Sequence, residues 1–200
     1  MPSRQKLIFA LVVLCIALVT GLGAMWLTRS GPGGSGEALV GGPFTLTNQD
    51  GQRVTEQDFR GKYMLIFFGF TFCPDVCPSE LQVMSAAIDQ LGPQGDKIQP
   101  VFITIDPERD TPEAMKLYIS NFHPRLTGLT GSAEDIAAVA KAYRVYYAKA
   151  KQAEGAAPGD YLMDHSTILY LMGPDGKFVK HFTYGTDVKT LADGLREVVQ

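Results

Sequence analysis

The hydrophobic positions divide the chain into an apolar N-terminal run, a short segment of small residues and a long region of alternating strand and helix patterns. The run from Leu7 to Leu27 holds 21 residues and no charge. At about 1.5 Å per residue, a helix of this length crosses a bilayer core of about 30 Å. Arg4 and Lys6 precede the run. The positive-inside rule therefore predicts a cytoplasmic N-terminus and a domain on the other side of the membrane.

A cleaved signal peptide is the alternative interpretation of this run. Gly21 and Gly23 are small residues before a cut at Ala24, but the run is longer than a usual signal core and has no Ala-x-Ala site. Either interpretation delivers the domain to an oxidising compartment such as a bacterial periplasm. The N-terminus lacks the Ser- and Arg-rich stretch of an organelle transit peptide. This favours a single-pass protein of the bacterial inner membrane whose domain faces the periplasm.

Composition sets the expected domain boundaries. Residues 1–29 form the membrane anchor, 30–42 form a flexible linker rich in Gly and Ser, and 43–200 form one domain. Three of the 18 basic residues precede residue 30, and all 21 acidic residues follow residue 36. An acidic domain argues against nucleic acid as a partner.

Within the expected domain, apolar stretches alternate with helical stripes. Tyr63 to Phe70 is nearly all apolar, which is the pattern of a central strand buried on both faces. A helix follows, and its apolar stripe consists of Leu81, Met84, Ile88 and Leu91. Further strands are expected at 44–47, 101–105, 145–150, 167–171 and 177–182, and further helices at 111–122, 132–143 and 188–198. Such alternation predicts an α/β fold with a mixed sheet that has parallel crossovers and is flanked by helices.

Two of the three cysteines lie in one turn between the buried strand and the helix. Cys15 belongs to the N-terminal run, which leaves Cys73 and Cys77 as the only pair in the domain. A disulfide that closes so short a loop adds little stability, so the pair suits redox exchange or a soft metal ion better. Because Pro is favoured at the first helical position, we expect the helix to begin at Pro78 with Cys77 at its cap. The positive end of the helix then lowers the pKa of a nearby thiol.

His165 is the candidate third member of the site. A cysteine pair after a core strand, a βαβ unit and a late hairpin with a final helix resemble a thioredoxin-type domain. In such a sheet, the loop before the first hairpin strand lies next to the cysteine turn, and His165 stands near that place. Two thiolates and one imidazole suit copper, whereas zinc prefers a fourth ligand or a bound water. Chemistry alone leaves a plain hydrogen-bonded loop histidine as the alternative.

Three segments of the sequence together resemble the Sco/SenC family. They are Cys73-Pro-Asp-Val-Cys77-Pro, Ile105-Asp106-Pro107-Glu108-Arg109-Asp110-Thr111-Pro112 and Tyr161-Leu-Met-Asp164-His165-Ser166. The family consists of membrane-anchored, thioredoxin-like copper proteins that help to assemble the CuA centre of cytochrome c oxidase. The likeness spans roughly residues 40–200 and includes the anchor.

The resemblance implies that Cys73, Cys77 and His165 bind copper, as Cu(I) or Cu(II), and that the two cysteines cycle between dithiol and disulfide. It also implies that Asp106 lies near the site, and Asp164 is expected to orient a neighbouring ligand. The implied partners are the CuA-bearing subunit of cytochrome c oxidase, other copper chaperones or thiol reductants, and the inner membrane.

Two functional hypotheses follow. The first is a copper chaperone that delivers copper to the CuA site, reduces the cysteines of that site, or does both. The alternative is a thiol–disulfide oxidoreductase that acts on periplasmic protein thiols without a copper-transfer role. A thiol peroxidase is disfavoured, because the sequence supplies no clear peroxide-activating Arg and Thr beside Cys73.

Overall fold

The computed structural model describes residues 17, 20, 40–151, 157 and 159–199. The predicted membrane span from Leu7 to Leu27 lies outside these residues, apart from positions 17 and 20. Within the described ranges, no helix combines the length and the apolar character that a membrane crossing needs. Leu39–Gln200 forms one compact unit. Its start overlaps the expected linker, because the N–H of Gly41 donates to the carbonyl of Ala142 at 3.0 Å.

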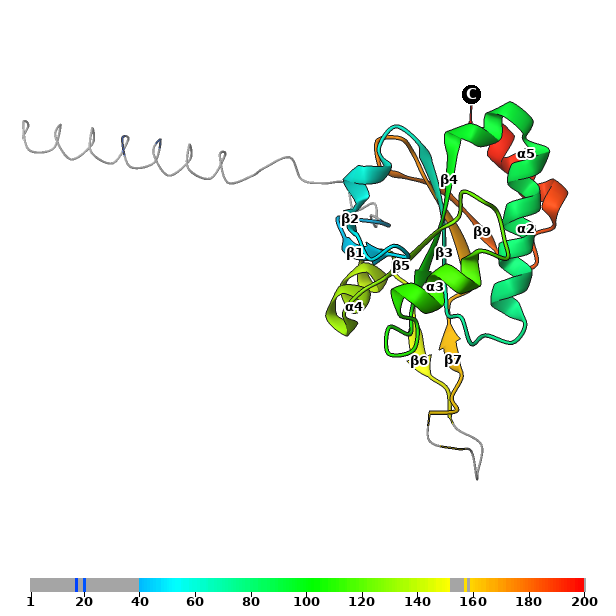
Figure 1. Cartoon of the computed structure of the whole chain (residues 1–200). Coiled ribbons are helices and arrows are strands. Elements are labelled where there is room, and N and C mark those ends of the chain that lie inside the picture. The colour runs from blue at the N-terminus through cyan, green and yellow to red at the C-terminus, as the bar shows by residue number, and fades with distance from the viewer. Residues whose placement is uncertain (1–16, 18–19, 21–39, 152–156, 158, 200) are drawn as a thin grey trace, which may run out of the picture. The chain divides into compact units, whose positions relative to one another are not determined.

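A seven-stranded mixed sheet forms the centre of the domain, in the order β2-β1-β5-β4-β3-β8-β9 (Figure 1). Its strands are β1 (Thr45–Asn48), β2 (Arg53–Thr55), β3 (Tyr63–Gly69), β4 (Ile98–Thr104), β5 (Thr127–Thr130), β8 (Ile168–Met172) and β9 (Phe178–Thr183). Strands β3, β4 and β5 run parallel, and the other neighbouring pairs are antiparallel. Each parallel pair is joined through a helix, as a parallel crossover requires.

Helices cover both faces of this sheet, which confirms the predicted α/β fold with a mixed sheet flanked by helices. They are α2 (Val76–Gln90), α3 (Pro112–Ile119), α4 (Ala133–Ala142) and α5 (Val188–Arg196), with 3-10 turns at Glu56–Phe59 and Gly92–Lys97. On one face, Phe102 of β4 contacts Tyr118 of α3, with ring centroids 5.6 Å apart. Phe102 is the register partner of Phe67, so the next residue, Phe68, points to the opposite face. There it contacts Tyr143 at the end of α4 at 5.4 Å.

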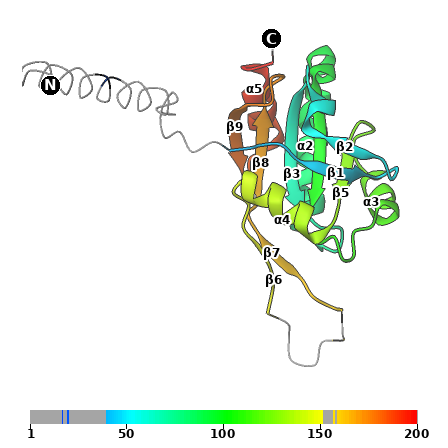
Figure 2. The same ribbon diagram turned by 90° about the vertical axis from the view of Figure 1, so that its left-hand side faces the viewer.

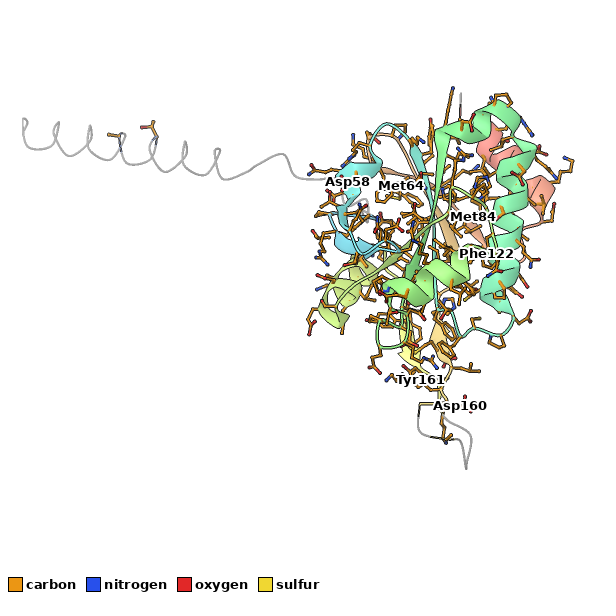
Figure 3. The ribbon with its side chains drawn as sticks, in the orientation of Figure 1. Asp58, Met64, Met84, Phe122, Asp160 and Tyr161 are labelled. Carbon is orange, nitrogen blue, oxygen red and sulfur yellow. The ribbon has the colours of Figure 1, made fainter. Side chains whose placement is uncertain are left out.

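The central strand and the helical stripe predicted from the sequence form the core. Residues 64–69 of β3 are buried, and Leu81, Met84 and Ile88 of α2 are at most 1% exposed. Met84 lies between α2 and the sheet (Figure 3). Burying a side chain of this size stabilises a fold by about 1.5–3 kcal/mol. The cysteine turn is therefore connected at both ends to well-packed elements, β3 before it and α2 after it.

The sequence pattern does not predict β2, β5 or a short strand β7 (Met163–His165). Strand β5 is brief, and Gly128 at its centre gives no hydrophobic signal. A Cβ atom at Gly128 would lie 3.1 Å from Met115 Cε and 3.3 Å from Ile119 Cγ2, so the glycine lets α3 approach the strand closely. Strand β7 pairs antiparallel with β6 (Tyr147–Lys149) in a separate two-stranded sheet.

This second sheet belongs to an arm that extends beyond the body of the domain (Figure 2). We define the arm as residues 147–151 and 159–165. Beyond the paired strands, the N–H of Ala150 donates to the carbonyl of Leu162 at 2.8 Å. The arm emerges at the end of the domain where β3 finishes and α2 begins (Figure 1).

Gly69, the last residue of β3, leaves no room for a side chain. A Cβ atom there would lie 2.8 Å from Cys77 Sγ and 2.8 Å from Phe102 Cε2. We expect Gly69→Ala to lower the free energy of unfolding by about 1–3 kcal/mol, because overpacking displaces the buried thiol and the ring. Urea unfolding measures this change. Gly42→Ala is the control, since its nearest neighbour would be Ala142 Cβ at 3.4 Å. Equal stabilities of the two variants would contradict the packing argument.

Candidate metal-binding site

Helix α2 begins at Val76, two residues before the start predicted at Pro78. Asp75 is the N-cap, and its carbonyl accepts the N–H of Ser79 at 3.1 Å. Pro78 is therefore the third helical residue, where the N–H has no helical acceptor in any case. Proline is tolerated there for that reason, and Cys77 lies within the first turn instead of at the cap.

Cys73 lies just before the N-terminus of α2, and its sulfur accepts a hydrogen bond from one of the backbone amides that have no helical partner. The N–H of Cys77 donates to the Sγ of Cys73 at 3.3 Å, so the sulfur takes the place of a capping oxygen. Both residues are free thiols. Cys73 is partly exposed and Cys77 is completely buried.

The two thiols have opposite pKa shifts. Hydrogen bonds from the Cys77 thiol, from His165 and from the Cys77 amide lower the pKa of Cys73 to about 4, although partial burial opposes them. The hydrogen bond to Cys73, burial and the negative charge of Cys73 raise the pKa of Cys77. Near neutral pH the pair holds one accessible thiolate and one buried thiol. A thiolate is the form that attacks disulfides and binds metal ions.

His165 is the last residue of β7, whereas the sequence predicted a loop position. Its backbone pairs with Tyr147 of β6, so the arm carries the imidazole. Nε2 lies 3.7 Å from Cys77 Sγ, and Nδ1 lies 3.1 Å from the carbonyl oxygen of Ser166. A proton on Nε2 allows the ring to donate a hydrogen bond to the Cys73 sulfur, whereas a proton on Nδ1, donated to the Ser166 carbonyl, leaves the Nε2 lone pair free for a metal ion.

Cys73 and His165 line a surface depression of about 330 Å³, and the buried Cys77 contacts both of them. Its apolar wall includes Phe70, Pro74, Val76 and Leu162. The sequence prediction that Cys73, Cys77 and His165 gather at one place therefore matches where the structure puts them.

The spacing of Cys77 and His165 fits a shared metal ion. With metal–sulfur and metal–nitrogen distances of about 2.3 and 2.0 Å and an angle of about 110–120°, the donor atoms lie about 3.5–3.7 Å apart. The observed separation is 3.7 Å. Among the described residues, no group of three or more His, Cys, Asp and Glu side chains is arranged to hold a metal ion as it stands. In this state a hydrogen bond joins the two cysteines, and a metal ion would replace its proton. The three-ligand set stays a prediction.

Asp106 and Asp164 have different surroundings. Asp106 is 2% exposed, accepts the hydroxyl of Tyr161 at 2.8 Å and forms an ion pair with Arg109. Asp164 is exposed at the edge of the depression, and its backbone pairs with Ala148. The side-chain contacts of Asp106 are made to the arm and to the loop after β4. The roles predicted for these two carboxylates stay predictions.

Asp110 is a residue that the sequence reasoning missed. It is fully buried and accepts the N–H of Thr71 at 3.1 Å, the Thr71 hydroxyl at 2.5 Å and the Thr104 hydroxyl at 2.5 Å. Burial raises the pKa of Asp110, although these hydrogen bonds oppose the shift. Asp110 thus fixes the start of the cysteine turn to the end of β4. Its position directly before the helix cap Thr111 concealed this role.

We expect Asp110→Asn to lower the free energy of unfolding by about 1–3 kcal/mol, because an amide turns one acceptor into a donor that faces buried donors. Urea unfolding measures the loss. Asp96→Asn is the matched control, since the Asp96 side chain is 82% exposed and forms a surface ion pair with Arg125. If Asp110→Asn were as stable as this control, the buried hydrogen bonds would not be what holds the turn.

The fold and the site together define a thioredoxin-like domain with a Cys-x-x-x-Cys pair and a histidine beside it. The SCO1/SenC family profile matches residues 32–200, and the chain belongs to this family. The mitochondrial SCO1 homolog 1 of Arabidopsis thaliana is 48% identical over 168 residues, which are 84% of this chain and 49% of that protein. The chain spans about half the length of that curated relative.

Solved structures of related proteins have the same fold. Arabidopsis thaliana ScoI with copper bound has a TM-score of 0.74 and 48% identity, covering 80% of this chain and 98% of that one. BsSco has a TM-score of 0.61 and 26% identity, covering 80% and 92%. BsSco is a member of the Sco family of cytochrome c oxidase assembly proteins, and a disulfide switch has been identified in it.

Proposed function

We propose that this protein is a membrane-anchored copper chaperone that serves the CuA site of cytochrome c oxidase. It delivers copper to that site, reduces the cysteines of that site, or does both. The observation that carries the proposal is the 3.7 Å separation of Cys77 Sγ and His165 Nε2, with Cys73 joined to Cys77 by a hydrogen bond. Two soft sulfur donors and one imidazole suit Cu(I).

Related proteins support copper as the metal that this chain binds. The Arabidopsis thaliana ScoI structure, at 48% identity, has copper bound. BsSco is named among cytochrome c oxidase assembly proteins. The acceptor proposed here is the CuA-bearing subunit, with other copper chaperones or thiol reductants as further partners.

Copper is the cargo of the proposed reaction. Cys73 is at the surface of the depression, so an incoming ligand reaches a metal ion there first from the Cys73 side. Acceptor ligands then replace Cys73, His165 and Cys77 one at a time, and the oxidation state of the metal does not change. The proton that leaves the Cys77 thiol on loading returns to it on release, because Cys73 is already a thiolate near neutral pH.

The opposite pKa shifts of the two cysteines favour a second activity at the same pair. The Cys73 thiolate attacks a disulfide of the target and releases one target thiolate. The Cys77 sulfur, on losing its proton to solvent, attacks Cys73 in the mixed disulfide and releases the second target thiolate. The target gains two electrons, and Cys73 and Cys77 become a disulfide. If the protein performs only this chemistry, on periplasmic protein thiols and without copper transfer, it is the thiol–disulfide oxidoreductase of the alternative hypothesis.

The proposed location rests on the sequence. Residues 1–29 anchor the chain, 30–42 link it, and 43–200 form the copper-binding domain in the periplasm of a bacterium. A membrane-impermeant maleimide added to intact spheroplasts tests this orientation. It should label Cys73, and labelling only after lysis would contradict the proposal.

A transfer assay tests the proposed function. The reduced chain is loaded with Cu(I) without oxygen and mixed with an apo CuA domain, whose cysteines are either reduced or oxidised. Transfer to the reduced acceptor supports a chaperone, and reduction of the oxidised acceptor by the copper-free chain supports the thiol activity. Disulfide exchange without any copper transfer would leave the oxidoreductase alternative. The chaperone proposal also fails if His165→Ala leaves copper affinity and oxidase assembly unchanged.

A further inference from the structure

Arg109 lies between the two segments that carry the candidate ligands. The Cζ atom of its guanidinium is 4.5 Å from the ring centroid of Phe72 and 3.7 Å from that of Tyr161. Phe72 directly precedes Cys73, and Tyr161 belongs to the arm, four residues before His165. Figure 3 labels Tyr161 below the body of the domain, where the arm leaves it. One cation therefore contacts an aromatic ring from each segment.

Polar contacts fix the guanidinium in this place. Its Nε forms an ion pair with the buried carboxylate of Asp106, and its Nη1 donates to the carbonyl of Gly159 in the arm at 3.4 Å. Asp106 also accepts the Tyr161 hydroxyl at 2.8 Å. The Arg109 side chain is 15% exposed. Its Nη2 is buried without a hydrogen-bond partner among the described residues, so ring contacts account for much of what surrounds it.

The loop around Arg109 also holds both segments through other residues. Glu108 pairs with Lys149 of the arm at 2.7 Å, and the Lys149 ammonium lies 4.3 Å from the centroid of the Tyr161 ring. On the other side, Asp110 holds Thr71 at the start of the cysteine turn. Residues 106–110 thus connect the cysteine turn to the arm, and Arg109 is the member that touches both.

We propose that Arg109 is a positioning residue that sets the distance between the cysteine pair and the imidazole of His165. It acts through Phe72 and Tyr161 and does not itself bind the metal. The inference rests on the proposed function in so far as His165 is a ligand. The contact between arm and turn, however, exists without any metal ion.

The planar guanidinium is needed for this role. A planar group can place one face against each of two rings while its edge pairs with a carboxylate, and its Cζ atom lies close to both ring centroids here. A lysine at this position keeps the charge and the pairing with Asp106 but has no plane to place between two rings. We call the contact of Arg109 with the rings of Phe72 and Tyr161 the clamp. Arg109→Lys therefore distinguishes an effect of the clamp from an effect of the positive charge alone.

The test compares Arg109→Lys with the full-length parent, both reduced and metal-free, by hydrogen exchange. Arm amides such as Ala150, which donates to Leu162, should exchange about tenfold faster in Arg109→Lys, while amides between β3 and β4 stay unchanged. Arg53→Lys is the matched control, because Arg53 pairs with Asp135 at 3.1 Å on the exposed surface. Unchanged exchange of the arm amides in Arg109→Lys would overturn the proposal.

A second variant guards against a general loss of folding. Tyr161→Leu removes the other half of the clamp and should loosen the same amides, and combining it with Arg109→Lys should add little more. Additive effects of the two substitutions would overturn the proposal, because they would mean independent contacts.

Copper binding then tests whether Arg109 positions His165 relative to the cysteine pair. In Arg109→Lys the thiolate-to-Cu(II) absorption should shift and the copper affinity should fall about 10-fold or more, as when a ligand loses its orienting partner. A looser arm in Arg109→Lys, in a protein whose parent binds no copper, would support the clamp and count against the proposed function. A looser arm with unchanged copper absorption and affinity would overturn the positioning role.

Discussion

Replacing Cys77 by serine should remove stoichiometric copper binding while the domain stays folded. The substitution replaces the sulfur of a side chain that is completely buried by an oxygen. The hydroxyl oxygen of serine is a poor ligand for Cu(I). Loss of a residue that only orients a ligand lowers metal affinity about 10–100-fold, so loss of the ligand itself should lower it by more than about 100-fold. Competition with a chromophoric Cu(I) chelator under anaerobic conditions measures the affinity.

The third cysteine supplies the control for this experiment. Cys15 lies in the N-terminal apolar run, so Cys15→Ser should bind copper as the parent does. Cys73→Ser should resemble Cys77→Ser. If Cys77→Ser kept the affinity of the parent, the buried sulfur would not be a ligand, and the site would have to be built from Cys73 and His165 with other donors.

The alkylation rate of Cys73 should be nearly independent of pH between about 5.5 and 9. Its pKa is lowered to about 4, so it is almost fully thiolate across that range, whereas an ordinary thiol is about 0.1% thiolate at pH 5.5. The lower pKa also makes each thiolate about 100-fold less nucleophilic. The net rate should be about tenfold above a free cysteine at pH 5.5 and about 100-fold below it at pH 9.

The sign of this effect follows from the folded-state pKa. Reactivity is present above about pH 4 and is lost as the pH falls through that value, because Cys73 then gains a proton. Iodoacetamide labelling of the Cys15→Ser chain, read by mass spectrometry of the cysteine peptide, measures the profile. In urea the dependence should return to that of an ordinary thiol. A folded chain whose rate rises about tenfold per pH unit up to about pH 8.5 would contradict the thiolate assignment.

Local patterns predict much of this fold. The unbroken apolar stretch before the cysteines becomes β3, and the stripe of Leu81, Met84 and Ile88 faces the core. The start of α2 is misplaced by two residues because proline is tolerated at any position in the first turn, not only at the first. The pattern could not separate these positions, since Pro78 lacks a helical acceptor at either of them.

The missed features depend on contacts distant in the sequence. His165 is a strand residue because β7 pairs with β6. The sequence of Met163, Asp164 and His165 by itself does not indicate a strand. Asp110 directly precedes the expected helix at 111–122, yet its partner Thr71 lies 39 positions away. Arg109 lies between the rings of Phe72 and Tyr161, a placement that no local pattern indicates. The sequence therefore predicted the candidate ligands but not the residues that hold them together.

One measurement tests the central claim most directly. The full-length chain in detergent, reduced and free of oxygen, is titrated with Cu(I) and Cu(II) beside His165→Ala. The proposed site predicts one copper per chain, with thiolate-to-Cu(II) absorption that changes in the variant and an affinity that falls. Absence of stoichiometric copper in the parent, or a variant indistinguishable from it, would contradict the three-ligand site formed by Cys73, Cys77 and His165.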